Sequence, residues 1–228
     1  MVSAGIWLAL DASASIGTVA VLRDGALVAE RTVEMRSAAA EHYFPAVLDA
    51  LAEIGARTGD ITRVVSGAGP GSFTSLRVVG AIAKGIAVGT GCPLFGVPSL
   101  ALIVAASSAT HEPGRWLATL DAMRGDRYLA LVTVGNGSEI VAVEPLGLAP
   151  GAECGARAAA LGATPIGPDE ALAAMPHARG LTRCLRIVDC AGPVDVAAWE
   201  PVYGRLAEAQ VKWEATHGRP LTGERFAT

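Results

Sequence analysis

The sequence predicts an α/β fold built from two similar lobes, of which the second is reduced. One observation is a strand–turn–strand unit that occurs twice, each time with a first strand that ends in aspartate, at Asp11 and again at Asp121. Another is a strand–turn–helix unit around a glycine-rich turn at residues 66–77, with apolar runs on both sides. A turn cluster at residues 111–114 marks the expected boundary between a lobe of residues 1–110 and a smaller lobe of residues 111–228.

The first lobe is expected to open with a hairpin and then to alternate helices and strands. Asp24-Gly25 between two β-branched runs is a strong signal for a tight turn between antiparallel strands. The expected strands are residues 6–12, 18–22, 26–33, 61–65 and 92–96, and the expected helices are residues 41–54, 77–89 and 99–107. The first helix is expected to bury one face, formed by Phe44, Val47, Leu48, Leu51 and Ile54.

The second lobe is less clearly patterned. Residues 116–121 and 127–134 predict two strands joined by a turn. From 135 to 192 the chain is rich in alanine, glycine and proline, and only a small α/β arrangement with short runs at 164–166 and 185–190 is expected. The tail from residue 200 onward is expected to end in a short helix and a polar terminus.

Composition narrows the class of protein. Of the 228 residues, 51% are hydrophobic, which is enough for a sizeable core. The 18 basic and 22 acidic residues give a net charge of −4, which argues against direct nucleic-acid binding through a basic surface. The four cysteines stand singly, as expected for reduced thiols in a cytoplasmic protein. We expect no signal peptide and no membrane span, because Asp11 and Lys84 interrupt the two best apolar runs.

The glycine-rich turn has two interpretations. Its glycines allow close backbone approach, and Ser72 or Thr74 is suited to cap the following helix. A helix N-terminus beside small residues also suits an anion, so Asp11, Gly69, Gly71, Ser72 and Thr74 form a candidate anion or nucleotide loop. The spacing fits neither a Walker A loop nor a dinucleotide fingerprint. A structural corner, with Asp11 as a turn carboxylate, is therefore equally consistent with the sequence.

The helix after this turn carries a second apolar stripe. Val78, Ala81, Gly85 and Val88 form a stripe of small residues beside the stripe expected to pack on the sheet. Such a stripe allows close approach of another helix. We expect it to form a partner-binding surface, widened on the neighbouring helix by Tyr43, Val47 and Leu51.

No metal site is expected. A helical metal pair needs two histidines four residues apart, but alanine occupies positions 38 and 46, on either side of His42. The other three histidines, His111, His177 and His217, are scattered along the chain. His42 is therefore expected to be a surface or interface residue.

The sequence Gly69-Pro70-Gly71-Ser72-Phe73-Thr74, followed by Leu76-Arg77 and residues 83–87, resembles the TsaB family. The resemblance extends over nearly the whole chain and is specific at residues 8–22, 41–98, 117–125 and 201–213. Ser75 stands where a glycine is more usual, in a helical first turn that readily accepts the change. The resemblance implies an actin-like fold with ribonuclease H-like sheets and a shortened second lobe.

The resemblance also implies a function. Members of this family have no catalysis of their own and act as dimerisation or scaffold subunits in making threonylcarbamoyladenosine, next to the anticodon of tRNA. They pair with TsaD, which carries the metal and transfers the threonylcarbamoyl group, and a small ATPase, TsaE, joins them. The pairing uses the two helices that match residues 41–54 and 77–89, through which isolated members self-associate. No cofactor is expected in this chain, ATP and metal belong to the partners, and tRNA is reached only through the complex.

Two rival functions are considered beside this one. A nucleotide-hydrolysing actin-like ATPase would use Asp11, the loop at Gly69 and Asp121, and titration with ATP would test it. A glycoprotease-like metallopeptidase is disfavoured, because the chain has no His-Glu-x-x-His motif and no helical histidine pair. The sequence does not decide whether the chain binds nucleotide, whether a homodimer is physiological, or how tightly partners bind.

Overall fold

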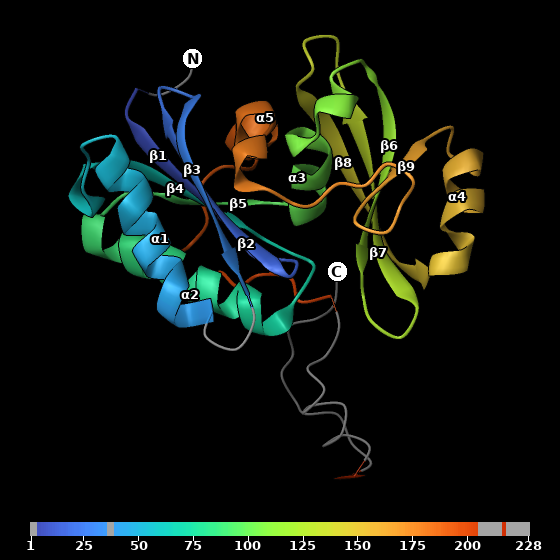
Figure 1. Cartoon of the computed structure of the whole chain (residues 1–228), viewed down its shortest axis with the longest axis horizontal. Coiled ribbons are helices and arrows are strands. Elements are labelled where there is room, and N and C mark those ends of the chain that lie inside the picture. Colours follow the sequence, from blue (N-terminus) through green and yellow to red (C-terminus); the bar gives the residue numbers. More distant parts are fainter. Residues whose placement is uncertain (1–3, 36–38, 205–215, 218–228) are drawn as a thin grey trace.

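A five-stranded sheet forms the first half of the molecule (Figure 1). The computed structural model describes residues 4–35, 39–204, 216 and 217. The strands are β1 (Ile6–Asp11), β2 (Ile16–Arg23), β3 (Ala26–Glu34), β4 (Ile61–Gly67) and β5 (Leu94–Val97). They are arranged in the order β3-β2-β1-β4-β5, with β2 antiparallel to both neighbours and β1, β4 and β5 parallel. The expected hairpin turn is present, with positive φ at Asp24 and Gly25.

The second sheet repeats this order with one strand fewer. Its strands are β6 (Gly114–Asp121), β7 (Asp126–Val134), β8 (Ile140–Pro150) and β9 (Thr164–Ile166), in the order β8-β7-β6-β9. In each sheet the third strand of the unit lies at one edge, then the second, the first and the fourth. Two ribonuclease H-like sheets in one chain are the actin-like arrangement, so the predicted fold class is confirmed, including the reduced second half.

Helices cover both sheets and fill the space between them (Figure 1). α1 (Ala39–Glu53) and α2 (Phe73–Thr90) pack on one face of the first sheet, in a cluster that includes Leu8, Leu10 and Val64. α3 (Ser99–Ala106) and α5 (Leu181–Ala191) lie between the two sheets, and α4 (Cys154–Ala160) covers the outer face of the second sheet. The single-turn helices are η1 (Thr58–Asp60), η2 (Ser108–Thr110), η3 (Gly151–Glu153) and η4 (Ala178–Gly180).

One hydrophobic cluster spans the two sheets. It joins Trp7 and Val65 of the first sheet, through α3 and α5, to Leu120 and Val132 of the second. The alternation of side chains along β1 explains the arrangement, since Leu8 and Leu10 point to the α1–α2 side while Trp7 and Ala9 point to the other. The two sheets therefore share a core.

The elements of the first half were predicted closely. After residue 135 the expected run at 164–166 coincides with β9 and the run at 185–190 lies within α5, but β8 and α4 were not predicted. α2 begins at Phe73, four residues before the expected start. β8 was missed because it is an edge strand, mostly exposed, whose sequence contains Pro145 and Gly147. Residues 194–204, which the expected boundary assigns to the second lobe, return to the first sheet, where the Val194 N–H donates to Leu94 O at 2.8 Å. The short helix expected in the tail lies largely outside the described residues.

Among the described residues, α2 alone is long and apolar enough to cross a membrane. Of its 18-residue stretch, 39% is buried inside the molecule. Core helices of water-soluble proteins meet the same criterion, so this is weak evidence for a membrane span.

Candidate functional site

The glycine-rich turn between β4 and α2 is a tightly packed corner. Gly69 has φ of +80°, a conformation that favours glycine. Gly67 and Gly71 have no positive φ, so a different constraint explains them. A Cβ at Gly67 would overlap the Asp11 carboxylate, and one at Gly71 would overlap the backbone of Ser13. Gly67 and Gly71 therefore allow the turn to press against the end of β1.

Asp11 lies beneath this turn and is fully buried. Its Oδ1 accepts hydrogen bonds from the Ser13 N–H at 3.0 Å and the Ser13 hydroxyl at 2.8 Å, and its Oδ2 accepts one from the Ser99 hydroxyl at 2.6 Å. Burial raises the pKa of the Asp11 carboxyl, and the hydrogen bonds from Ser99 and Ser13 oppose that rise. Both carboxylate oxygens thus have partners within the chain, as expected for a turn carboxylate.

Most of the remaining groups of the candidate anion loop also contact the chain itself. Ser72 occupies the N-cap position of α2, as predicted, but its side chain pairs with the Ser75 hydroxyl at 2.9 Å and makes no capping bond. The Ser72 N–H donates to Ser13 O at 2.8 Å. A Cβ at Gly69 would overlap the carbonyl oxygen of Val202, and Thr74 is exposed. The turn brings Asp11, Gly69, Gly71 and Ser72 together, and groups of the chain fill the space beside them.

The two faces of α2 differ sharply. Val79, Ala83 and Ile86 are buried against the sheet. On the opposite side Ala81, Gly85 and Val88 are exposed and Val78 is half-buried, so the second stripe lies open as predicted. Val88 has 72% of its surface exposed, and a Cβ at Gly85 would meet nothing within 4 Å.

The structure corrects the contribution expected from α1. Tyr43, Val47 and Leu51 are core residues, each at most 1% exposed, and do not widen the open surface. The Tyr43 hydroxyl donates to Thr18 O at 2.6 Å and Asp11 O at 3.2 Å, which fixes the rotation of the helix. That rotation turns Phe44 and Leu48, expected in the core, partly outward.

The residues that the sequence analysis missed are therefore Phe44 and Leu48, which are 39% and 43% exposed. The apolar character of both side chains predicts burial, and the spacing alone does not separate the two adjacent stripes of α1. α1 and α2 contact each other on one face of the sheet. We define the outer face as Phe44 and Leu48 of α1 with Val78, Ala81, Gly85 and Val88 of α2.

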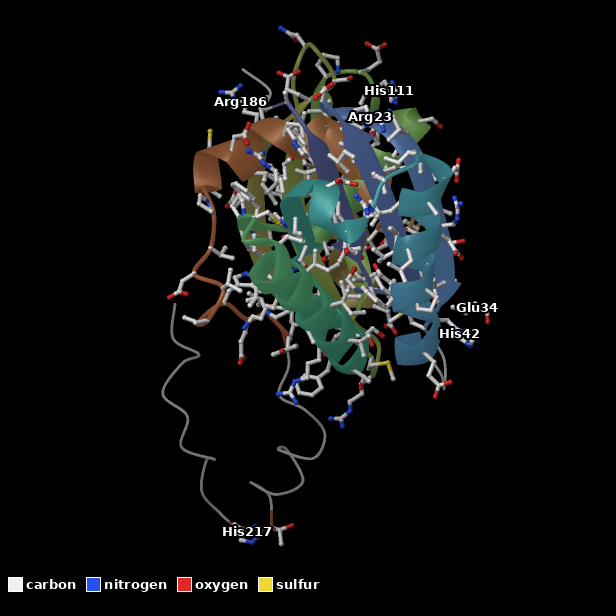
Figure 2. All side chains as sticks on the ribbon, turned by 90° about the vertical axis from the view of Figure 1, so that its left-hand side faces the viewer. Arg23, Glu34, His42, His111, Arg186 and His217 are labelled. Carbon is white, nitrogen blue, oxygen red and sulfur yellow. The ribbon has the colours of Figure 1, made fainter. Side chains whose placement is uncertain are left out.

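The described residues contain no group of three or more His, Cys, Asp or Glu side chains placed to hold a metal ion. Figure 2 shows His42 at the lower end of α1, His111 near the top of the molecule, and His217 at the bottom of the picture, far from both. His177 is nearly buried, and its Nδ1 accepts a hydrogen bond from the Arg179 N–H at 3.1 Å. Burial lowers the pKa of His177, and the neighbouring Arg179 lowers it further.

Known proteins resemble this chain in sequence and in fold. The family model for TsaD, tRNA N6-adenosine threonylcarbamoyltransferase, matches residues 34–149. The tRNA threonylcarbamoyladenosine biosynthesis protein TsaB of Escherichia coli is 33% identical over 54% of this chain and 53% of its own length. TsaB of Bacillus subtilis is 30% identical over 57% of this chain and 56% of its own. The chain thus spans about half the length of the curated relatives that it matches.

Two solved structures from Pseudomonas aeruginosa agree in fold over most of the chain. YeaZ superimposes with a TM-score of 0.67 and 24% identity, over 87% of this chain and 99% of its own. An uncharacterised protein with similarity to peptidase YeaZ has a TM-score of 0.73 and 23% identity, over 88% of this chain and 100% of its own. Sequence match, strand order and superposition agree, and the chain belongs to the TsaB family.

Proposed function

We propose that this chain is a non-catalytic scaffold subunit in the biosynthesis of threonylcarbamoyladenosine in tRNA. In this role it binds a TsaD-like catalytic subunit through the outer face. The observation that carries the proposal is the open stripe of small residues on α2, centred on Gly85. Family membership supports the pathway, since the relatives are named for this biosynthesis.

The chemistry of the outer face suits a helix–helix contact. Ala81, Gly85 and Gly89 recur every four residues along one exposed side of α2, so a partner helix approaches the backbone closely there. Phe44, Leu48 and Val88 add exposed apolar area on the same two helices, as large apolar side chains do at interface centres. An apolar surface of this kind is rarely left uncovered. When the catalytic subunit is absent, the same face pairs with a second copy of the chain across a two-fold axis.

The remaining partners follow from this role. A TsaE-like ATPase joins the pair, and the catalytic subunit holds the metal and the reacting groups. The net charge of −4 favours contact with tRNA through the complex over contact with this chain alone.

A charged side chain at the centre of the outer face tests the proposal. Gly85→Arg is compared with Gly155→Arg on α4, because both glycines are exposed, helical and open around the added Cβ. Each variant is co-expressed with the TsaD-like protein of the same genome, and copurification and the mass of the isolated chain are measured. We expect Gly85→Arg to fold as a monomer that binds its partner at least about a hundredfold more weakly, because an arginine is desolvated without a counter-charge.

The control should bind and self-associate like the parent. Retention of both the partner and the homodimer by Gly85→Arg would place the interface elsewhere. Transfer of threonylcarbamoyl to tRNA by the isolated chain would contradict the non-catalytic role.

A further inference from the structure

The last described segment of the chain returns across the molecule to the first sheet. After α5 ends, residues 194–204, which we call the strap, run from the space between the sheets to the start of α2 (Figure 1). The Val194 N–H donates to Leu94 O and the Val202 N–H donates to Ala68 O, both at 2.8 Å. Backbone hydrogen bonds therefore fasten both ends of the strap to the first lobe.

The middle of the strap lies behind α2, on the side opposite the outer face. Gly80 is on the buried side of α2, where an added Cβ would lie 3.3 Å from Pro201 Cγ and 3.7 Å from Trp199 Cζ3. Gly96 of β5 faces the same indole, and a Cβ there would lie 3.4 Å from Trp199 Nε1. Trp199 is therefore a wedge between α2 and β5, and two glycines leave room for it.

The end of the strap packs on the first turn of α2. The ring of Tyr203, which is 8% exposed, packs on the ring of Phe73 with centroids 4.6 Å apart. The guanidinium of Arg77 lies over both rings, 4.3 Å from the centroid of Phe73 and 5.5 Å from that of Tyr203. The Tyr128 hydroxyl of β7 donates to Tyr203 O at 3.3 Å, which connects the strap to the second sheet.

We propose that the strap is a positioning element that sets where α2 stands, and so determines whether the outer face fits its partner. This inference rests on the proposed function, because it assumes that α2 carries the partner surface. Val79 and Ala83 of α2 reach the core directly, but between them the buried side carries Gly80, where Trp199 and Pro201 fill the space that a side chain would occupy. A partner helix that packs closely on small residues fits only if α2 is held in place. Because the packing behind α2 is dense, a shift of the strap would also move α2. The strap also joins α2 to β7, so the second lobe acts on the partner surface through it.

The test removes the wedge and follows α2 directly. Trp199→Ala is compared with Leu129→Ala, which empties a buried site in the separate cluster under α4. Hydrogen exchange of the amides of α1 and α2 is measured in the isolated full chain, and affinity for the TsaD-like partner is measured separately. We expect Trp199→Ala to speed exchange in α2 about tenfold with α1 unchanged, and to weaken partner binding about tenfold.

Leu129→Ala should leave α2 exchange and partner binding unchanged even though it lowers the denaturation midpoint. If Trp199→Ala does not fold, Trp199→Leu should give the same pattern with smaller changes. Equal α2 exchange in the Trp199 and Leu129 variants, or loosening of α2 with full partner affinity, would overturn the positioning role. If the proposed function is wrong, the results differ from these: Gly85→Arg would still bind its partner, while Trp199→Ala would still speed hydrogen exchange in α2.

Discussion

The two halves of the molecule contain the same local structure in opposite environments. β1 ends in Asp11, whose Oδ1 accepts a hydrogen bond from the N–H two residues later, that of Ser13, at 3.0 Å. β6 ends in Asp121, whose Oδ1 accepts one from the N–H of Met123, also two residues later, at 3.2 Å. Asp11 is fully buried, whereas Asp121 is exposed and pairs with Arg127.

What differs is the chain that packs over each turn. The glycine-rich turn between β4 and α2 packs on the turn that follows Asp11. Gly67 lies against Asp11 and Gly71 against Ser13, and the Ser99 hydroxyl of α3 donates a hydrogen bond to the Asp11 carboxylate. In the second half, the chain after β9 leaves Met123 69% exposed. A local motif thus fixes the turn and its first hydrogen bond, while distant segments decide whether its carboxylate becomes part of the core.

The largest loss of stability is expected when a side chain is added where the glycine-rich turn packs on the turn after Asp11. In Gly71→Val the added side chain would collide with the backbone of Ser13, which is held by its bonds to Asp11 and Ser72. We expect the free energy of unfolding to fall by about 3 kcal/mol or more, because neither backbone segment has room to move. Urea unfolding followed by circular dichroism measures this loss.

The matched change over the second turn is Gly125→Ala. Gly125 has φ of +84°, but an added Cβ would meet nothing within 4 Å. The decrease in the free energy of unfolding should therefore come from backbone strain alone, about 1–2 kcal/mol. Equal losses in the two variants would mean that the first turn is no more tightly covered than the second.

The next effect concerns the charge of Asp11. Burial raises the pKa of this carboxyl above its usual 3.8, so the folded protein binds the proton more tightly than the unfolded chain does. The resulting stabilisation is present below the unfolded pKa and is lost as the pH rises through the folded pKa. We expect the stability of the parent minus that of Asp11→Asn to decrease as the pH rises over this window, by about 1.4 kcal/mol for each unit by which the two pKa values differ.

Unfolding measured from pH 3.5 upward in steps checks this expectation. A difference that increased with pH would mean that the hydrogen bonds from Ser13 and Ser99 outweigh burial. The pKa of Asp11 in the folded state would then lie below its usual value.

Most of the fold could be predicted from the sequence, because short sequence patterns determine the turns, strands and helices of its first half. Asp24-Gly25 gave the hairpin, the apolar spacing gave α1 and α2, and the repeated strand ending in aspartate indicated two related sheets. β8 gave a weak signal, since it lies at an exposed edge, and the short apolar run at 185–190 indicated α5 only in part. Their positions depend on contacts with segments far away in the chain.

The candidate site was predicted only in part, for a related reason. The open stripe on α2 follows from its own periodicity, and Ala81, Gly85 and Val88 are exposed as expected. The rotation of α1 does not follow from periodicity, because it is fixed by the hydrogen bond from Tyr43 to Thr18 O across 25 residues of sequence. Gly69 and Gly80 gave no sign of the strap that packs on them, since a glycine reveals a close approach but not which segment approaches.

The smallest effect is expected at the second aspartate. Arg127 pairs with Asp121 at 2.9 Å and with Asp169 at 3.0 Å, and about half of the surface of each carboxylate side chain is exposed. Water and salt screen such ion pairs, and Arg127 retains its ion pair with Asp169 when Asp121 is changed. Asp121→Asn should therefore lower the free energy of unfolding by less than about 1 kcal/mol, and less still at 1 M salt. The amide oxygen can still accept the bond from the Met123 N–H, so the turn itself should persist. A loss as large as that in Gly71→Val would show that the exposed turn supports the second sheet as strongly as the buried turn supports the first.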